Sequence, residues 1–338
     1  MQKNEIHSAI RLKLANANRI VITSHVRPDG DAVGSLLGLG LSLIAAGKQV
    51  EMVLADGVPA PFRHLTGSDL ITRHIKGRYD LAIVTDCSDL IRTGGSLADR
   101  IPDINIDHHI TNLNFATINL VDSGEAASSA ILAGSMPLWD LAIPTAAASA
   151  LLTGIISDTL GFRTSNVTSE TLRLAAGLVD LGANLTDLYN RALVQRSYEA
   201  VLFWGMGLEN LQRDDRMVWT YLSLEDRMRA GYSGNDDADL VNLLATIDSA
   251  EVTVVFVEQK SGHIKVSWRG VPGYDVSRIA LQFGGGVHAA AAGADITGDI
   301  YNVRERVLEA TRKLFNGAKT STIRNNEAPE KSIDEKLA

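Results

Sequence analysis

The chain has 338 residues, which exceeds the roughly 250–300 residues at which a single hydrophobic core stops growing, so we expect two domains. Its 32 basic and 40 acidic residues give a formal net charge of −8, which argues against a broad cationic surface for long nucleic acid. The single cysteine, Cys87, excludes an internal disulfide and is typical of a reducing compartment.

The amino-terminal residues predict a short amphipathic helix, and they lack the apolar core of a signal peptide. The longest uncharged runs, residues 32–47 and 141–157, are shorter than the ~20 apolar residues that span a bilayer. We therefore expect a cytoplasmic protein without a membrane segment.

Short β-branched segments alternate with helical segments in the first half of the chain. Residues 32–46 have a helical pattern and are followed by Gly47, a residue that commonly ends helices. The predicted strands are nearly continuous in apolar character, as buried parallel strands are; they are residues 19–24, 49–54, 81–85 and 101–106. This alternation predicts an α/β domain with a doubly wound parallel sheet.

The second half begins with helices and ends with a mixed pattern. Residues 125–182 are mainly helical, and residues 184–212 predict one connecting helix. The remaining pattern predicts a smaller α/β unit, with a strand at 217–224, a helix at 236–248, a hairpin of 251–258 and 263–268, and helices at 275–282 and 301–315.

These patterns predict four segments of the chain. A first α/β domain is expected at residues 1–186, followed by a helical linker at 187–212. A smaller α/β domain is expected at 213–316. Residues 317–338 are polar and nearly free of large apolar side chains, which predicts a disordered tail.

Three predicted strands run directly into side chains that commonly bind metal ions. The first is followed by His25, Asp29 and Asp31, the third by Asp86, and the fourth by Asp-His-His at residues 107–109. In open α/β sheets, ligands bind beyond the carboxyl ends of the strands. Carboxylates collected at one edge repel one another and resist burial unless cations neutralise them. We therefore expect a metal site at this edge.

A predicted apolar helix at residues 149–157 arrives at Asp158. The helix dipole disfavours a carboxylate at that end, and a metal ion would remove the penalty. Imidazole and carboxylate ligands without a thiolate suit Mn²⁺, and also Fe²⁺, Co²⁺ or Mg²⁺, better than structural zinc.

Six ordered motifs resemble those of the DHH phosphoesterase family and together cover about residues 15–300. The first domain contains HVRPDGDA from His25, VTDCSD around Asp86, the DHH triplet, and GIISDT around Asp158. In the second domain, VSWR at 266–269 and FGGGVHAAAAG at 283–293 resemble the arginine strand and the glycine-rich histidine turn of the DHH-associated C-terminal domain. Length and two-domain build are most similar to the bifunctional oligoribonuclease and pAp phosphatase group, also called nanoRNases.

The resemblance implies that residues 1–186 are the catalytic, metal-binding domain and that residues 213–316 bind substrate across a cleft from it. It also implies two divalent cations bridged by Asp86, which would activate a water molecule for attack on phosphorus. The implied ligands are His25, Asp29 and Asp86 for one ion, and Asp31, Asp86, His108 and Asp158 for the other. The implied substrate contacts are Arg269, His288 and the glycines Gly284, Gly285 and Gly286, with Arg163 as a further candidate. Arginine suits this task because its planar fork binds phosphate through two donors.

His109 is expected to contact the scissile phosphate, because adjacent strand residues point to opposite sides and only one histidine of the pair can then face the metal. A turn of the chain at His109 would weaken that argument. Asp107 is expected to orient His108 or a neighbouring loop. Val287 stands where the family usually has a fourth glycine, so either that position is unstrained or the substrate contact differs.

Ordinary structural explanations exist for several of these residues. Residues 28–31, Pro-Asp-Gly-Asp, are by themselves typical of a turn, and Asp158 could be an ordinary helix end. A polar surface loop explains Arg163 as well as substrate contact does. Cys87 is expected to be a small buried residue and not a nucleophile.

We expect a metal-dependent phosphodiesterase or phosphatase. Its expected substrates are very short oligoribonucleotides or 3′-phosphoadenosine 5′-phosphate (pAp), which it would convert to mononucleotides. The family resemblance also allows a homodimer. A phosphodiesterase of cyclic or linear dinucleotides is the first alternative. A pyrophosphatase or polyphosphatase, and a catalytically silent nucleotide sensor, are the others.

Overall fold

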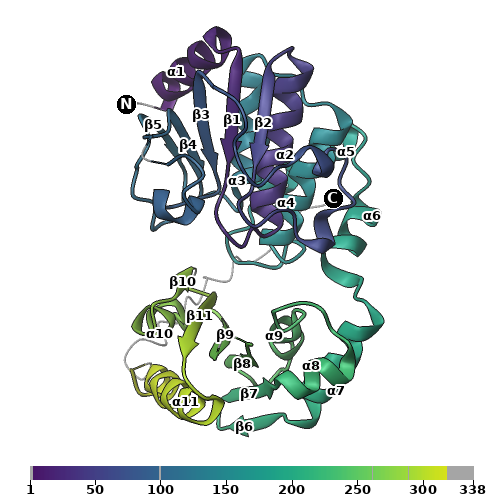
Figure 1. Ribbon diagram of the computed structural model, residues 1–338, viewed down its shortest axis with the longest axis vertical. Coiled ribbons are helices and arrows are strands. Elements are labelled where there is room, and N and C mark those ends of the chain that lie inside the picture. Colours follow the sequence, from purple (N-terminus) through teal and green to yellow (C-terminus); the bar gives the residue numbers. More distant parts are fainter. Residues whose placement is uncertain (1–2, 99, 261, 288, 318–338) are drawn as a thin grey trace, which may run out of the picture. The chain divides into compact units, whose positions relative to one another are not determined.

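The computed structural model describes residues 3–98, 100–260, 262–287 and 289–317. The chain divides into two compact units, residues 1–195 and the part that begins at Arg196 (Figure 1). Each unit has its own sheet and its own hydrophobic core.

A parallel sheet forms the centre of the first unit. In the described residues it has five strands in the order β2-β1-β3-β4-β5. The strands are β1 (Arg19–Thr23), β2 (Gln49–Val53), β3 (Leu81–Thr85), β4 (Ile104–Asp107) and β5 (Ile118–Val121). The register pairs Thr23 with Val84 and Thr85 with Ile106, so the carboxyl ends of β1, β3 and β4 lie level at one edge.

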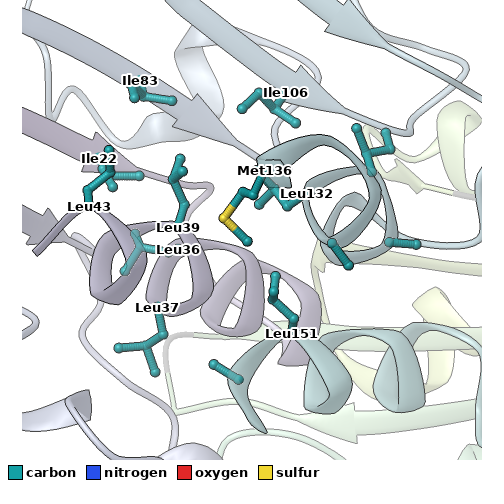
Figure 2. Close-up of a cluster of buried hydrophobic side chains, with 14 of the residues drawn as sticks. Ile22, Leu36, Leu37, Leu39, Leu43, Ile83, Ile106, Leu132, Met136 and Leu151 are labelled. Atoms are coloured by element: carbon teal, nitrogen blue, oxygen red, sulfur yellow. The ribbon is translucent and has the colours of Figure 1, made fainter. Parts of the chain in front are cut away.

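Helices of the first unit pack on the sheet and enclose its core. They are α1 (Lys3–Asn16), α2 (Gly30–Ala45), α3 (Ser128–Ser135), α4 (Thr145–Asp158), α5 (Ser169–Asp180) and α6 (Leu185–Tyr189). Figure 2 shows Leu39 and Leu43 of α2 on the side that faces the strands, and Leu37 on the side away from them. Leu132, Met136 and Leu151 belong to the same core. Ile22, Ile83 and Ile106 come from three strands and are at most 1% exposed. Val21, Val53 and Val84 pack in a second cluster with Leu97.

Glycines allow α2 and α4 to pack backbone against backbone. A Cβ atom on Gly34 would lie 2.5 Å from the carbonyl oxygen of Ala150 and 2.8 Å from the amide nitrogen of Gly154. A Cβ atom on Gly154 would lie 2.7 Å from Oδ1 of Asp31. The two helices therefore meet at a distance that only glycine permits, and this contact brings Asp31 beside α4.

A mixed sheet forms the second unit. Over the described residues its order is β10-β11-β9-β8-β7-β6, and its one parallel pair there is β7 with β8. The strands are β6 (Gln212–Asp214), β7 (Met217–Leu222), β8 (Val252–Glu258), β9 (His263–Gly270), β10 (Gly286–Val287) and β11 (Ala291–Thr297). The predicted hairpin is confirmed as β8 and β9, and the α/β class of the chain is confirmed as well.

Helices pack against this sheet in two hydrophobic clusters. The helices are α7 (Tyr198–Glu209), α8 (Leu224–Ala230), α9 (Leu240–Leu244), α10 (Ser277–Gln282) and α11 (Ile300–Gly317). Trp268 and Phe256 belong to the cluster that includes α10 and α11. Phe203 and Val255 belong to the cluster that includes α7 and α9.

The predicted helices at 184–212 and 236–248 are wrong in extent. The first is interrupted because Gln195 has an extended backbone and the Ser197 hydroxyl accepts a hydrogen bond from Ala200 N, which starts α7 anew. The second shrinks to α9 because Ala238 and Asp239 have φ values of 51° and 66°, which an α-helix does not allow.

Four strands were not predicted, and others were predicted too long. Among the unpredicted strands, β6 and β10 have only three and two residues. β5 and β11 are missing from the predicted elements; β5 has four residues with alternating burial, and β11 is rich in alanine and glycine, so neither carries a strong strand pattern. β4 begins at Ile104 and not at Ile101, which is 64% exposed.

The carboxyl-terminal helix extends one residue beyond the predicted domain end. α11 includes Gly317, the first residue of the predicted tail, and residues 318–338 lie outside the described residues. Where the chain is described, none of its helices combines the length and the apolar character that crossing a membrane requires.

Replacing Gly34 with alanine should destabilise the first unit, because the new methyl group collides with the backbone of α4. We expect a loss of about 1–3 kcal/mol in the free energy of unfolding, measured by urea denaturation. Gly177→Ala in α5 is the matched control, since its Cβ would meet nothing within 4 Å. It should leave stability unchanged or raise it by about 0.5–1 kcal/mol. An equal loss in both variants would contradict the close-packing argument.

Candidate metal centre

Side chains from the ends of β1, β3 and β4 and from α2 and α4 converge in the first unit. In the described part of the chain, three groups each bring one ligand atom per residue within 4.8 Å of one another. The groups are His25, Asp29 and Asp86; Asp31, His108 and Asp158; and Asp86, His108 and His109. The structure therefore brings together all six side chains that the sequence proposed as metal ligands, with His109 beside them.

Asp29 has two functions in this arrangement. Its Oδ1 accepts hydrogen bonds from Asp31 N and Ala32 N, both at 3.0 Å, and so caps the first turn of α2. Its Oδ2 lies 3.8 Å from Nε2 of His25. The segment is thus the start of a helix and not the turn of the ordinary explanation: one oxygen of Asp29 caps α2, and the other lies near His25.

Asp31 is held by the amino terminus of α3. Its Oδ2 accepts from Ser128 N at 2.6 Å and its Oδ1 accepts from Ser129 N at 2.9 Å. Burial, and after it the nearby carboxylate of Asp86, raise the pKa of Asp31 to about 7, although His108 and the hydrogen bond from Ser129 oppose the shift. Sequence reasoning missed this support, because Ser128 and Ser129 follow Asp31 by 97 and 98 positions and such a separation leaves no local pattern.

Asp86 lies at the centre of the cluster. Its backbone has φ of 50°, which turns the chain out of β3 and aims the side chain across the sheet edge. His25 Nε2 lies 3.5 Å from Oδ2, His108 Nε2 lies 3.8 Å from Oδ1, and the Ser128 hydroxyl donates to Oδ1 at 3.0 Å. Burial opposes the charged form of Asp86, but the hydrogen bond from His25 and the neighbouring imidazoles hold its pKa well below the usual range.

Both histidines of the pair face Asp86, contrary to the expectation that they point to opposite sides. β4 ends at Asp107, so the alternation of a strand no longer applies to residues 108 and 109. His109 Nδ1 lies 3.7 Å from Oδ1 of Asp86, and the two imidazole rings meet edge to face at 4.8 Å between their centroids.

Asp107 supports His109, whereas the expected partner was His108 or a neighbouring loop. It is fully buried, and its Oδ1 lies 2.6 Å from His109 Nδ1. Its Oδ2 accepts from the Asn112 amide at 2.6 Å, and that amide lies 2.8 Å from Oδ1 of Asn105. Sequence reasoning missed both asparagines; Asn105 interrupts an apolar strand, which was the available signal.

Asp158 is the last residue of α4, as the sequence suggested. Its Oδ2 lies 3.4 Å from Nε2 of His108. Burial raises the pKa of Asp158 well above its usual value, and the charge of Asp31 adds to that effect. For His108, burial opposes protonation, but Asp86 and Asp31 raise its pKa above the usual value.

The donor set fits divalent cations. The buried Asp31 and the half-buried Asp158 have raised pKa values beside the ionised Asp86, and this conflict is the one that cations relieve. Oxygen and imidazole donors at these positions suit Mn²⁺ or Mg²⁺. Cys87 supplies no thiolate, because burial raises its pKa to about 12.

The glycine-rich turn is partly a packing feature. A Cβ atom on Gly285 would lie 2.7 Å from that of Ala294 in β11, so glycine is needed there for strand packing. Gly284 has φ of 75°, a conformation that favours glycine. Gly286 and Val287 form β10, so the backbone at the fourth position of the turn belongs to a strand.

Other proposed substrate contacts lie apart from this cluster in the sequence. Arg269 lies in β9 of the second unit, and His288 lies outside the described residues. Arg163 is exposed, and its Nε donates to the carbonyl oxygen of Leu160 at 2.9 Å.

Known proteins match the chain along most of its length. The DHH family, N-terminal domain, matches residues 19–155, and the DHHA1 domain matches residues 217–317. The bifunctional oligoribonuclease and PAP phosphatase NrnA of Thermus thermophilus is 35% identical over 300 residues, covering 87% of this chain and 89% of that relative. The protein of the same name from Mycoplasma pneumoniae is 29% identical over 310 residues, covering 87% of this chain and 92% of that relative.

A solved structure agrees on the fold. The exopolyphosphatase-related protein of Bacteroides fragilis has a TM-score of 0.86 and 24% identity, and the match covers 94% of this chain and 100% of that chain. With the two domain matches and the Thermus relative, the conclusion is that the chain belongs to the DHH family and carries its N-terminal domain together with a DHHA1 domain.

Proposed function

We propose that this protein is a two-metal phosphoesterase that hydrolyses short oligoribonucleotides and pAp to mononucleotides. The observation that carries the proposal is the position of Asp86, which belongs to two of the ligand groups. A carboxylate shared in this way can bridge two cations. The names of the two NrnA relatives support the substrate class, and the matches cover most of this chain and most of each relative.

The first unit holds the cations in this proposal. His25, Asp29 and Asp86 would bind one ion, and Asp31, His108 and Asp158 would bind the other. Asp86, whose Oδ1 lies 3.8 Å from Nε2 of His108, would join the second set as well, as the family resemblance implies. We propose Mn²⁺ as the preferred ion because imidazole and carboxylate donors are mixed. Bound divalent cations neutralise phosphate charge and lower the pKa of water, which is the chemistry a phosphoester hydrolysis needs.

His109 is the proton donor in this proposal, and its neighbours hold its ring in position. Burial opposes its protonation, but the hydrogen bond to Asp107 and the charge of Asp86 raise its pKa above the usual value. A protonated imidazole can donate to a phosphate oxygen or to the leaving oxygen. Asp107 and Asn112 fix the ring through one chain of hydrogen bonds, so they act as positioning residues.

The second unit binds the substrate's other anionic group in this proposal. Arg269 supplies the charge, and Gly284 and Gly286 leave the backbone open to a phosphate; His288 and Arg163 are further proposed contacts. A single arginine and a short turn match a small anion better than a long polynucleotide, whose binding needs many cationic contacts.

A substrate panel tests the proposal. An RNA dinucleotide, an RNA trinucleotide, pAp, cyclic and linear dinucleotides, and pyrophosphate are incubated in parallel with Mn²⁺ or with EDTA. We expect Mn²⁺-dependent release of mononucleotides from short RNA and of AMP from pAp. Turnover of pyrophosphate alone, or of nothing, would reject the proposal, and preference for cyclic dinucleotides would replace its substrate.

Asp86→Ala should abolish hydrolysis of both substrates, because it removes a donor from two ligand groups. Manganese titration by calorimetry should show loss of at least one bound ion. Asp180→Ala, an exposed position at the end of α5, is the control and should retain wild-type turnover. Near-normal activity of Asp86→Ala would exclude a shared ligand.

Manganese binding should release protons near pH 6. The pKa of Asp31 is about 7 without metal, so its carboxyl group carries a proton below that pH, and a cation must displace it. Affinity for Mn²⁺ should therefore weaken as pH falls from 7 to 5. Calorimetry in two buffers of different ionisation enthalpy measures the protons released, and Asp31→Asn should lower that number. A heat of binding independent of buffer would contradict this linkage.

Arg269→Ala should raise KM for pAp by about tenfold or more, because a charge-assisted bond to phosphate is lost, and change kcat much less. Steady-state kinetics of pAp hydrolysis provide the measurement. The matched control is Arg278→Ala on α10; the Arg278 side chain is 79% exposed and paired with Asp275. An unchanged KM in Arg269→Ala would remove this residue from the binding site.

A further inference from the structure

Arg269 is held in place by uncharged oxygens. Its Nε donates to Oδ1 of Asn242 at 2.8 Å, and its Nη1 donates to the carbonyl oxygen of Trp268 at 2.9 Å. Trp268 is fully buried, and its indole N–H donates to the Thr311 hydroxyl at 3.2 Å, so the backbone support is rigid. The other support, Asn242, comes from the short helix α9.

A neutral partner fixes the guanidinium without cancelling its charge. A carboxylate in the place of Asn242 would form a charge-assisted pair with Arg269 and compete directly with a phosphate ligand. Burial lowers the pKa of Arg269, while the carboxylates of Asp237 and Asp239 act on it electrostatically in the opposite direction. Asp237 Oδ2 accepts from Val241 N at 3.0 Å, and Asp239 Oδ2 accepts from Arg196 at 2.6 Å, so both are committed elsewhere.

The segment that leads into α9 is strained and strongly held. Ala238 and Asp239 both have a left-handed backbone, which non-glycine residues adopt at a cost. Asp236 Oδ1 accepts from the Tyr232 hydroxyl at 2.5 Å and from Ala238 N at 3.0 Å. The Trp204 indole donates to the carbonyl oxygen of Ala238 at 2.9 Å. Such strain persists only where the surroundings fix the conformation, and here the result is a defined position for Asn242.

We propose that Asn242 is a positioning residue that fixes the guanidinium of Arg269 for the anionic group of the substrate while leaving its charge available. This inference rests on the proposed function, because it assigns to Arg269 the binding of a phosphate. Asn242 acts through Arg269 and needs no contact of its own with the substrate.

Asn242→Ala tests the positioning, and Asn242→Asp tests the neutrality. We expect Asn242→Ala to raise KM for pAp by about tenfold, with kcat changed less than about twofold, since a hydrogen bond to a charged group is lost. Asn242→Asp keeps an acceptor oxygen of the same reach but adds a negative charge, and it should raise KM at least as much. Leu243→Ala, on the same helix and 38% exposed, is the control and should keep the wild-type KM.

A double-mutant cycle separates positioning from a structural effect. If Asn242 acts through Arg269, then Asn242→Ala should add little to the KM of Arg269→Ala. The inference would be overturned if the two single increases in KM multiply in the double variant. An unchanged KM in Asn242→Ala, or wild-type kinetics in Asn242→Asp, would overturn it as well. Thermal unfolding shows whether the variants fold, and Asn242→Asp, which preserves shape, serves if the alanine variant does not.

Binding of AMP separates this inference from the proposed function. Calorimetric titration of AMP needs no turnover, and its Kd should weaken about tenfold in Asn242→Ala and in Asn242→Asp. A wild-type protein that hydrolyses no member of the panel rejects the proposed function, while the AMP titrations still decide the role of Asn242. If the wild-type protein hydrolyses pAp and both variants keep the wild-type affinity for AMP, only the role of Asn242 is rejected.

Discussion

The candidate metal centre depends on how the repulsion among its carboxyl groups, which gather at one edge of the parallel sheet, is relieved. Asp31, Asp86 and Asp158 are each close to one another and to imidazoles, and their pKa values move in opposite directions. The amino terminus of α3 stabilises Asp31, and His25 stabilises Asp86. The remaining conflict is the reason that this edge fits cations, and cations at this edge are what a phosphoester substrate requires.

Glycine packing and hydrogen-bonded supports convert that conflict into a defined geometry. The close contact of α2 with α4 sets Asp31 beside the helix that ends at Asp158. Asn112 and Asp107 orient His109. Asp31 and His109 are thus held by neighbours, Ser128 and Asp107, that are not proposed as metal ligands.

The second unit solves the reverse electrostatic problem. In the proposed function Arg269 is a positive group that must stay available to an anion, and an amide oxygen and a carbonyl oxygen support it. The nearby carboxylates of Asp237 and Asp239 are bound to other donors. The first unit thus collects negative charge that cations can neutralise, whereas the second unit supports a positive charge with uncharged oxygens.

The sequence by itself determined the family, the parallel sheet and the six clustered ligand candidates, because strand ends and short motifs such as residues 107–109 are local patterns. Tertiary structure alone decided which residues donate or accept the supporting hydrogen bonds. Ser128 donates to Asp31, Asn112 donates to Asp107, and Asn242 accepts from Arg269. It also decided the short strands and the extent of α9, where local propensity is weak. The physical reason is that a hydrogen bond between distant residues leaves no periodicity in the sequence, whereas burial of a strand or helix face does.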